Sequence, residues 1–148
     1  AAPWSCGDGA VAARPAYDKP VPVPDPDSAP FWEGCRNGRL LIQHCRDCGH
    51  NQFPPGNVCS ACGAGAIEWI EASGRGRVFS WIVVVHPVPK PVYAGDVPYV
   101  VALVELEEGV RMPTNIVGCD SADIVADMPV RVLFDHVSED VVLPRFRP

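Results

Sequence analysis

Four cysteines within a stretch of 18 residues, CRDCGHNQFPPGNVCSAC, are the side chains best suited to chemistry in this sequence. Cys45 and Cys48 form one Cys-x-x-Cys pair, Cys59 and Cys62 form a second, and each pair is followed by glycine. A turn of this kind directs two sulfur atoms toward one centre while backbone amides donate hydrogen bonds to them, and two such turns complete a tetrahedral thiolate site. The spacing therefore predicts a Cys₄ metal site, with structural zinc as the expected ion.

Other uses of these thiols stay open at the level of the sequence. Iron in a rubredoxin-like site takes the same four ligands. A redox-active pair normally occurs once, near a βαβ unit that this sequence does not show. His44 and His50 flank the first pair and could replace a ligand, although four cysteines make them redundant. Because four protein ligands leave no open coordination position, we expect the metal to hold the fold and not to catalyse a reaction.

No other segment offers a complete active site. The Gly-x-Ser-x-Gly motif, a phosphate-binding glycine loop and a dinucleotide fingerprint are all absent from the sequence. The segment SGRGR at 73–77 could approach a phosphate, but we interpret it as a turn whose glycines supply special backbone angles. His86 and His136 end predicted strands without an evident paired nucleophile. Glu107 and Glu108 are expected to lie solvated in a tight turn, so we do not expect the chain to be catalytic alone.

Composition limits the remaining classes of protein. The chain has 148 residues, of which 47% are hydrophobic and 20% charged, as in an ordinary globular protein with a core. The net charge of −6 argues against broad electrostatic capture of nucleic acid or of an anionic membrane. No apolar run approaches the roughly 20 residues that cross a bilayer. We therefore expect neither a nucleic-acid partner nor a membrane partner.

The other cysteines indicate the compartment. Seven cysteines are present, and Cys6, Cys35 and Cys119 are scattered and not patterned, which favours a reducing cytoplasm. We expect Cys35 and Cys119 to be small core residues. The sequence begins without methionine and without a secretion signal, so we expect a domain excised from a longer chain.

The proline distribution suggests three segments. Residues 1–28 are rich in proline and predict an extended linker or tail of polyproline character. Residues 29–70 are expected to form a short helix and the zinc ribbon, which the segment RLLIQHC at 39–45 enters as a short strand. The remaining residues, 71–148, are expected to form a barrel.

A short helix is expected over residues 27–38. Asp27 or Ser28 can cap its free amides. Phe31 and Trp32 then form an aromatic knob at the start of this helix. The knob packs either on the protein's own core or on a partner, because a short helix beside a linker has little else to contact.

Short segments rich in β-branched and aromatic residues predict five strands in the last part of the chain. Residues 74–86 form the first strand, and residues 99–118 form a hairpin of two. A short helical turn at 121–128 precedes the last two strands, at 129–137 and 141–148. Five strands with a small helix between the third and fourth match the oligonucleotide/oligosaccharide-binding (OB) fold, so we expect a mainly β protein. An immunoglobulin-like sandwich would need about seven strands.

The order of these features resembles the family called domain of unknown function 35, whose members join a rubredoxin-like zinc ribbon to an acyl-CoA-associated OB-fold. The resemblance spans roughly residues 29–148. The segments that carry it are FWEGCRNGRLLIQHCRDCG, FPPGNVCSACG, WIEASGRGRVFSW, PYVVALVELEEGVRMPTNIVG and LPRFRP.

The resemblance implies a non-catalytic subunit that binds a thiolase-fold enzyme, either an aldolase or a thiolase, and helps to admit or position an acyl-CoA. The chain looks, in addition, like the C-terminal domain of steroid side-chain-degrading proteins in which a hotdog-fold hydratase domain is fused upstream. In such complexes a retro-aldol step cleaves a steroid acyl-CoA to a 17-ketosteroid and propionyl-CoA. The resemblance assigns the metal to Cys45, Cys48, Cys59 and Cys62, and makes Phe31 and Trp32 candidates for a partner or substrate-channel surface.

Charge distinguishes the ribbon from the barrel. Residues 31–62 carry three arginines against two acidic residues, whereas residues 63–148 carry seven basic and twelve acidic residues. A CoA phosphate is therefore expected near the ribbon, with Arg36 and Arg39 as candidates. The alternative function, a nucleic-acid-binding zinc ribbon and OB-fold module, would need aromatic platforms interleaved with lysine and arginine. The barrel contains a single lysine, Lys90, which disfavours this alternative.

Overall fold

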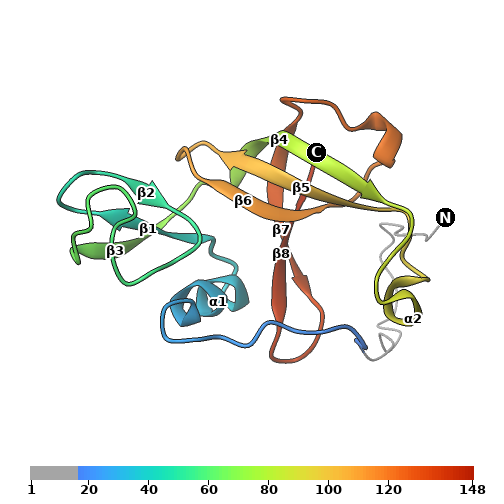
Figure 1. Ribbon diagram of the computed structural model, residues 1–148, viewed down its shortest axis with the longest axis horizontal. Coiled ribbons are helices and arrows are strands. Elements are labelled where there is room, and N and C mark those ends of the chain that lie inside the picture. Colours follow the sequence, from blue (N-terminus) through green and yellow to red (C-terminus); the bar gives the residue numbers. More distant parts are fainter. Residues whose placement is uncertain (1–16) are drawn as a thin grey trace.

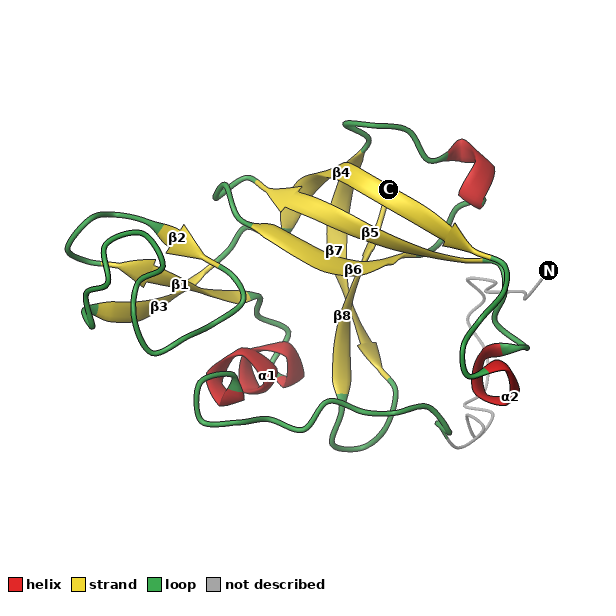
Figure 2. Cartoon of the chain, in the orientation of Figure 1, coloured by secondary structure: helices red, strands yellow, loops and turns green. Residues whose placement is uncertain are grey.

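The computed structural model describes residues 17–148 (Figures 1 and 2). Most of the predicted linker at 1–28, including Cys6, lies outside the described residues. The described part of that segment contains no helix or strand, and a turn at 26–28 leads into the first helix. Its Lys19 forms an ion pair of 2.8 Å with Asp96, which ties the segment to a loop of the barrel.

The first helix, α1, spans Ala29–Arg36 and is followed by Gly38, whose φ of 69° is the left-handed conformation that ends helices. The start of the helix differs from the expectation. Neither Asp27 nor Ser28 caps a free amide of α1 with its side chain. The hydroxyl of Ser28 instead donates to the carboxylate of Asp25 at 2.6 Å, so a turn before the helix fixes its entry.

The metal-binding region forms a three-stranded antiparallel sheet in the order β2-β1-β3. The central strand β1, Leu41–Cys45, was predicted from the sequence, whereas β2, Asn51–Gln52, and β3, Ile67–Glu71, were not. The strand β3 pairs along the whole of β1, from Leu41 opposite Glu71 to Cys45 opposite Ile67. The ribbon therefore continues past the second cysteine pair until the chain turns into the barrel.

Five strands close into a barrel, as predicted. Their order is β4-β5-β6-β8-β7, with β7 paired to β4 and with β6 and β8 parallel, which is the arrangement of an OB-fold. Along the chain, a short 3₁₀ helix, η1 at Ser121–Asp123, lies between β6 and β7, the third and fourth barrel strands in sequence order. The strands are β4 Arg75–Val84, β5 Tyr99–Leu106, β6 Arg111–Ile116, β7 Pro129–His136 and β8 Val142–Arg147.

The core lies inside the barrel and extends to α1. Strand side chains alternate between the two faces, so every second residue points inward. Gly76 of β4 is required by close packing, since a Cβ there would lie 2.5 Å from the carbonyl oxygen of Glu105. The most buried members of this core are the barrel residues Val78, Val104, Met112 and Phe146, together with Cys35, Leu40 and Ile42 from α1 and the ribbon.

The turn between β5 and β6 is only partly solvated: Glu107 is exposed, as the sequence predicted, whereas Glu108 is half-buried. Glu107 accepts two hydrogen bonds from Arg75, at 2.9 and 3.0 Å. Glu108 accepts from the amide of Ser73 with its carboxylate, and from the side chain of Asn51 in β2 with its carbonyl, at 3.0 Å. This turn therefore joins the barrel to the ribbon.

A loop at residues 85–98 connects β4 to β5 and was not predicted to contain a helix. It includes the four-residue helix α2, Lys90–Tyr93, which lies at the end of the barrel away from α1 (Figure 1). Among the described residues, no helix has the length and hydropathy needed to cross a bilayer.

Candidate metal centre and interdomain pocket

The structure brings the four predicted cysteines together. Their sulfur atoms all lie within 4.8 Å of one another. The Sγ atoms of Cys45 and Cys62 are 3.7 Å apart, and those of Cys48 and Cys59 are 3.6 Å apart. A tetrahedral ion with metal–sulfur bonds of about 2.3 Å requires sulfur separations of roughly 3.8 Å. The geometry of the cluster therefore fits a metal ion bound by four thiolates.

Each cysteine pair sits on a glycine turn. Gly49 and Gly63 have φ values of 77° and 75°, which non-glycine residues rarely adopt. The amide of Gly49 donates to the carbonyl of Cys45 at 2.8 Å, and Gly63 donates to Cys59 at the same distance. The two turns thus have the same backbone conformation, and each directs two sulfurs toward the centre.

The electrostatics of the thiols also favour a cation between them. The amides of Cys62 and Ala61 donate to Cys59 and lower the pKa of this thiol to about 6. Cys48 accepts from the amide of His50, but the nearby sulfurs of Cys62 and the other ligands raise its pKa to about 12. Four thiols this close cannot all ionise unless a positive ion lies between them. The donor set is therefore one that a divalent, thiolate-preferring metal completes.

The histidines beside the first pair lie outside the group of four cysteines, which is the only candidate metal-ligand group among residues 17–148. His44 bonds to Asn51 through Nδ1 at 2.7 Å. His50 lies 3.2 Å from the hydroxyl of Ser60 through Nε2. Both rings thus have other partners, and they connect the strands and turns around the centre.

Two buried glutamines, which the sequence pattern did not predict, support the second cysteine turn. The side chain of Gln52 donates to Gln43 at 2.8 Å and accepts from the amide of Ser60 at 2.8 Å. Gln43 also bonds to both the amide and the carbonyl of Gly56, each at 2.9 Å. Only 4% of Gln43 and 7% of Gln52 are exposed. These amides replace a hydrophobic core beneath the metal turn, and no local sequence pattern distinguishes them from surface glutamines.

The aromatic pair of α1 packs on the protein itself. Phe31 is 4% exposed and belongs to the same core cluster as the barrel residues, and Trp32 is half-buried against it. The rings of Phe31 and Trp32 meet edge to face with centroids 5.0 Å apart, and Phe53 from the ribbon lies 5.3 Å from Phe31. Of the two alternatives for the knob, the structure thus places Phe31 in the core. Cys35, on the same helix, is fully buried as predicted, and burial raises the pKa of its thiol to about 12.

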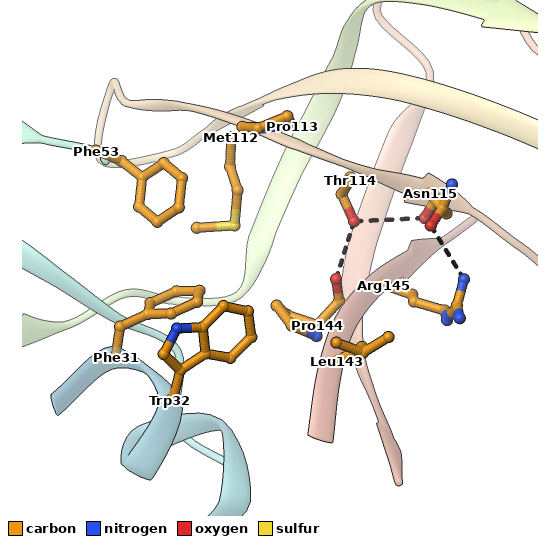
Figure 3. Close-up of a pocket in the computed structure, with 10 residues that line it drawn as sticks. All are labelled: Phe31, Trp32, Phe53, Met112, Pro113, Thr114, Asn115, Leu143, Pro144 and Arg145. Carbon is orange, nitrogen blue, oxygen red and sulfur yellow. Dashed lines mark hydrogen bonds between the residues drawn. The ribbon is translucent and has the colours of Figure 1, made fainter. Parts of the chain in front are cut away.

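These aromatic rings form one wall of a pocket between the ribbon and the barrel (Figure 3). We call it the interdomain pocket. The strands β6 and β8 pair only at Ile116 and Phe146, so they diverge beside it. The pocket has a volume of about 310 Å³. Its lining residues are Phe31, Trp32, Phe53, Met112, Pro113, Thr114, Asn115, Leu143, Pro144 and Arg145.

The far wall of the interdomain pocket carries polar side chains, which already have hydrogen-bond partners within the protein (Figure 3). Thr114 donates to the carbonyl of Pro144 at 3.0 Å. Arg145 donates to Asn115 at 3.0 Å and to the carboxylate of Asp135 at 2.8 Å. The lining contains no uncompensated charge and no paired acid and base. The pocket can therefore hold an apolar or neutral group, but it has no groups for acid–base catalysis.

The two arginines predicted to contact a phosphate, Arg36 and Arg39, lie outside the lining of this pocket. Arg39 forms an ion pair of 2.8 Å with Glu71, and both side chains are about half exposed. Arg36 is exposed in the last turn of α1. Their role in contacting a phosphate stays a prediction.

The outer surface of β4 and β5 exposes apolar side chains. Ile82 is 62% exposed, Phe79 46% and Leu103 36%. Leu103 lies opposite Ser80 in the register and is therefore diagonal to Ile82 on the same side of the sheet. The guanidinium of Arg111 stacks 3.6 Å from the centre of the Phe79 ring. We call Phe79, Ile82 and Leu103 the β4–β5 apolar face. The continuous apolar run of β4 was the only sign of it in the sequence.

Comparison with protein families matches both parts of the chain. Residues 32–68 match the model described as the rubredoxin-like zinc ribbon domain of ChsH2. Residues 69–135 match the model described as the C-terminal OB-fold domain of ChsH2.

Curated relatives extend the match. The 3-oxo-4,17-pregnadiene-20-carboxyl-CoA hydratase alpha subunit of Mycobacterium tuberculosis is 38% identical over 152 residues, which cover 88% of this chain and 47% of that protein. A DUF35 domain-containing scaffold protein of Methanocaldococcus jannaschii is 38% identical over 111 residues, covering 74% of this chain and 77% of that protein. The chain spans less than half the length of the hydratase alpha subunits that it matches.

A solved structure is similar over most of the chain. It is described as the Ltp2-ChsH2(DUF35) aldolase, and the matching chain is 42% identical with a TM-score of 0.77. The match covers 86% of this chain and 98% of that chain.

Proposed function

The chain belongs to the DUF35 family and has the zinc ribbon and OB-fold domains of ChsH2, and from this premise we propose that it is a non-catalytic subunit of a thiolase-fold aldolase. The observation that carries the proposal is the similarity to the chain of the Ltp2-ChsH2(DUF35) aldolase, which covers 98% of that chain. In the proposed complex, the partner supplies the acid–base residues. This chain supports the retro-aldol cleavage of a steroid side-chain acyl-CoA to a 17-ketosteroid and propionyl-CoA.

We propose zinc as the ion of the four-cysteine centre. A closed thiolate site suits zinc, and the match to a zinc ribbon model supports it. Cys45, Cys48, Cys59 and Cys62 would hold the ion, which would stabilise the ribbon when bound. Iron is the less favoured alternative, and it would colour the purified protein red whereas zinc would leave it colourless.

The β4–β5 apolar face is the surface that we propose for the aldolase partner. Exposed apolar side chains that lie together mark interfaces more often than free surface. The charged groups beside this face already form ion pairs: Arg77 and Arg111 both contact Glu105. A partner could therefore cover the face without leaving a charge buried and unpaired.

The interdomain pocket is the place that we propose for the apolar part of a substrate. Phe31 and Trp32 supply its aromatic wall, in keeping with their prediction as channel residues. We further propose that the complete protein has a hotdog-fold hydratase domain upstream and acts in the cytoplasm. The names of the hydratase alpha subunits and the free cysteines of the described residues support these two points.

Co-purification tests the proposed partner. We expect the chain, expressed with a tagged thiolase-fold aldolase, to form a stable complex that cleaves the steroid acyl-CoA. An Ile82→Asp variant is expected to lose the complex. Val58→Asp is the matched control, because Val58 is 47% exposed but lies on the ribbon. Loss of the complex with Val58→Asp alone would place the interface on the ribbon, and failure of the native chain to bind would refute the function.

The nucleic-acid alternative has a simple test. Most arginines of the barrel are paired with carboxylates, so they do not form a free cationic track along the surface. We expect no retention of single-stranded DNA or RNA in filter binding at low salt, where electrostatic binding is strongest. Retention that falls steeply with added salt would favour the alternative.

A further inference from the structure

Three arginines lie side by side on the outer surface of the barrel, although they are far apart in the sequence. Arg131 of β7 lies opposite Arg75 of β4 on one side and opposite Arg147 of β8 on the other. Their neighbours Val130 and Phe146 are buried in the core. Because strand side chains alternate, the three arginines point outward on one face.

The nearby carboxylates are already used by other arginines. Arg75 donates two hydrogen bonds to the carboxylate of Glu107 in the β5–β6 turn. Arg145, two residues before Arg147, is held by Asp135 at 2.8 Å. Within residues 17–148, no carboxylate lies within ion-pair distance of Arg131 or Arg147. Arg131 and Arg147 therefore face each other across adjacent strands, and no carboxylate of the described residues neutralises their charges.

Arg147 also has an unused hydrogen-bond donor. Its Nε atom is buried and has no acceptor. Buried donors nearly always have a partner, and like charges directly opposite each other in a sheet are unfavourable. An anion held by the outer N–H groups of Arg131 and Arg147 would compensate the two charges. It would reach Nε only after the surrounding atoms move aside, because Nε is closed to solvent.

The geometry of the arginines indicates which anion fits. A guanidinium group offers parallel N–H donors that match two oxygens of a phosphate. The same strand connects this position to the interdomain pocket, since Leu143 and Arg145 line the pocket and share the outer face of β8 with Arg147. Four residues of a strand span about 13 Å. A ligand that reaches from the pocket to Arg147 is therefore extended, with an apolar end and a phosphate end.

We propose that Arg131 and Arg147 bind the phosphate group of an extended organic phosphate whose apolar part occupies the interdomain pocket. The identification of this ligand with an acyl-CoA rests on the proposed function, whereas the anion site itself does not. The site differs from the expectation based on net charge, which placed the phosphate near Arg36 and Arg39. The net charge of the barrel is negative, which had argued against a phosphate site there. Most of its carboxylates are bonded to other groups, however, and do not neutralise Arg131 and Arg147.

Titration of the metal-loaded chain with inorganic pyrophosphate and with adenosine 3′,5′-bisphosphate tests the site. The measurement is isothermal calorimetry at low ionic strength, where charge interactions are least screened. We expect both anions to bind the native chain and to bind the Arg131→Gln/Arg147→Gln variant about tenfold more weakly or worse, because two charge-assisted contacts are lost. The control is Arg36→Gln/Arg39→Gln, which removes the same charge near the ribbon and should bind as the native chain does.

Three results would overturn the proposal: no binding to the native chain, equal loss in both variants, or loss only in the control variant. The barrel variant should unfold at the same temperature as the native chain or higher, because it removes a like-charged pair, so lost binding cannot be attributed to misfolding. Complex formation with the aldolase is measured separately. A chain that binds pyrophosphate through Arg131 and Arg147 but forms no complex keeps this site and refutes only the proposed function.

Discussion

The ribbon and the barrel are stabilised in different ways. Each barrel strand has a neighbour on both sides, and the enclosed residues Val78, Val104 and Phe146 are fully buried. The ribbon has an open sheet in which β2 is only two residues long. Its buried residues include the ligands Cys45 and Cys59, together with the glutamine pair. A unit this small cannot enclose a sufficient apolar core, so we expect a metal bound by the four cysteines to take the place of one.

The two regions nevertheless share part of one core. Phe31 and Cys35 of α1 belong to the same buried cluster as the barrel residues. The turn between β5 and β6 bonds to both Ser73 and Asn51. We therefore expect a bound metal to decide whether the ribbon is folded, and α1 and the β5–β6 turn to decide where the ribbon lies on the barrel.

Removal of the metal is expected to have the largest effect. Metal binding to small Cys₄ and related sites contributes roughly 10 kcal/mol or more of apparent folding free energy. Chelation, or a Cys59→Ser substitution, should unfold the ribbon and leave the barrel folded. Amide exchange by NMR would show this as lost protection at 41–71 with protection retained at 75–147. Cys119→Ser, outside the cluster, is the control, and loss of protection in both regions would contradict the separation.

Truncation of Phe146 should produce the next largest effect, confined to the barrel. Its side chain is fully buried, so Phe146→Ala is expected to lower the free energy of unfolding by about 3–5 kcal/mol. Urea unfolding measures this loss, and the bound metal per chain should stay constant. Phe146→Leu should cost clearly less. Release of the metal from the folded Phe146→Ala variant would show that the barrel also holds the ribbon together.

Phe31→Ala tests the link between the two regions. The side chain is 4% exposed and contacts both Trp32 and Phe53, so we expect a loss of about 3 kcal/mol. The variant should keep its metal but show a changed Trp32 fluorescence spectrum, because the interdomain pocket opens. Trp32→Phe provides a comparison at a half-buried position, where the loss should be smaller. An unchanged unfolding curve for Phe31→Ala would mean that α1 does not hold the ribbon on the barrel.

Gln52→Ala should have the smallest effect of the four and should act on the ribbon alone. The substitution removes one hydrogen-bond partner each from the amide of Ser60 and the side chain of Gln43, which should lower the free energy of unfolding of the ribbon by about 1–3 kcal/mol. We expect faster release of the metal to a coloured chelator, with barrel stability unchanged. Val58→Ala is the control, since Val58 is in the same loop but its side chain is exposed. Equal release rates in the two variants would show that the glutamines do not support the centre.

Local patterns accounted for much of the fold. The five barrel strands and the small helix between the third and fourth were predicted, because alternation and turn residues are properties of short segments. The prediction that Asp27 or Ser28 caps α1 was wrong, since the side chain of Ser28 bonds to Asp25 before the helix begins. The strands β2 and β3 were missed because they are short and are defined by their pairing with β1. Glu107 is exposed as predicted, whereas Glu108 is half-buried. Their bonds to Arg75 and Ser73 were missed because these partners are distant in the sequence.

The sequence by itself determined the metal centre, since the two Cys-x-x-Cys-Gly turns contain all the ligands and the backbone freedom that the centre requires. It also determined the order of elements from which the OB-fold follows. Only the tertiary structure decided that Phe31 lies in the core, that Gln43 and Gln52 support the centre, and that Arg131 faces Arg147. These features depend on the register between separate strands and on the packing of one region against another. Neither the register nor the packing is a property of any single segment, so no local pattern could reveal them.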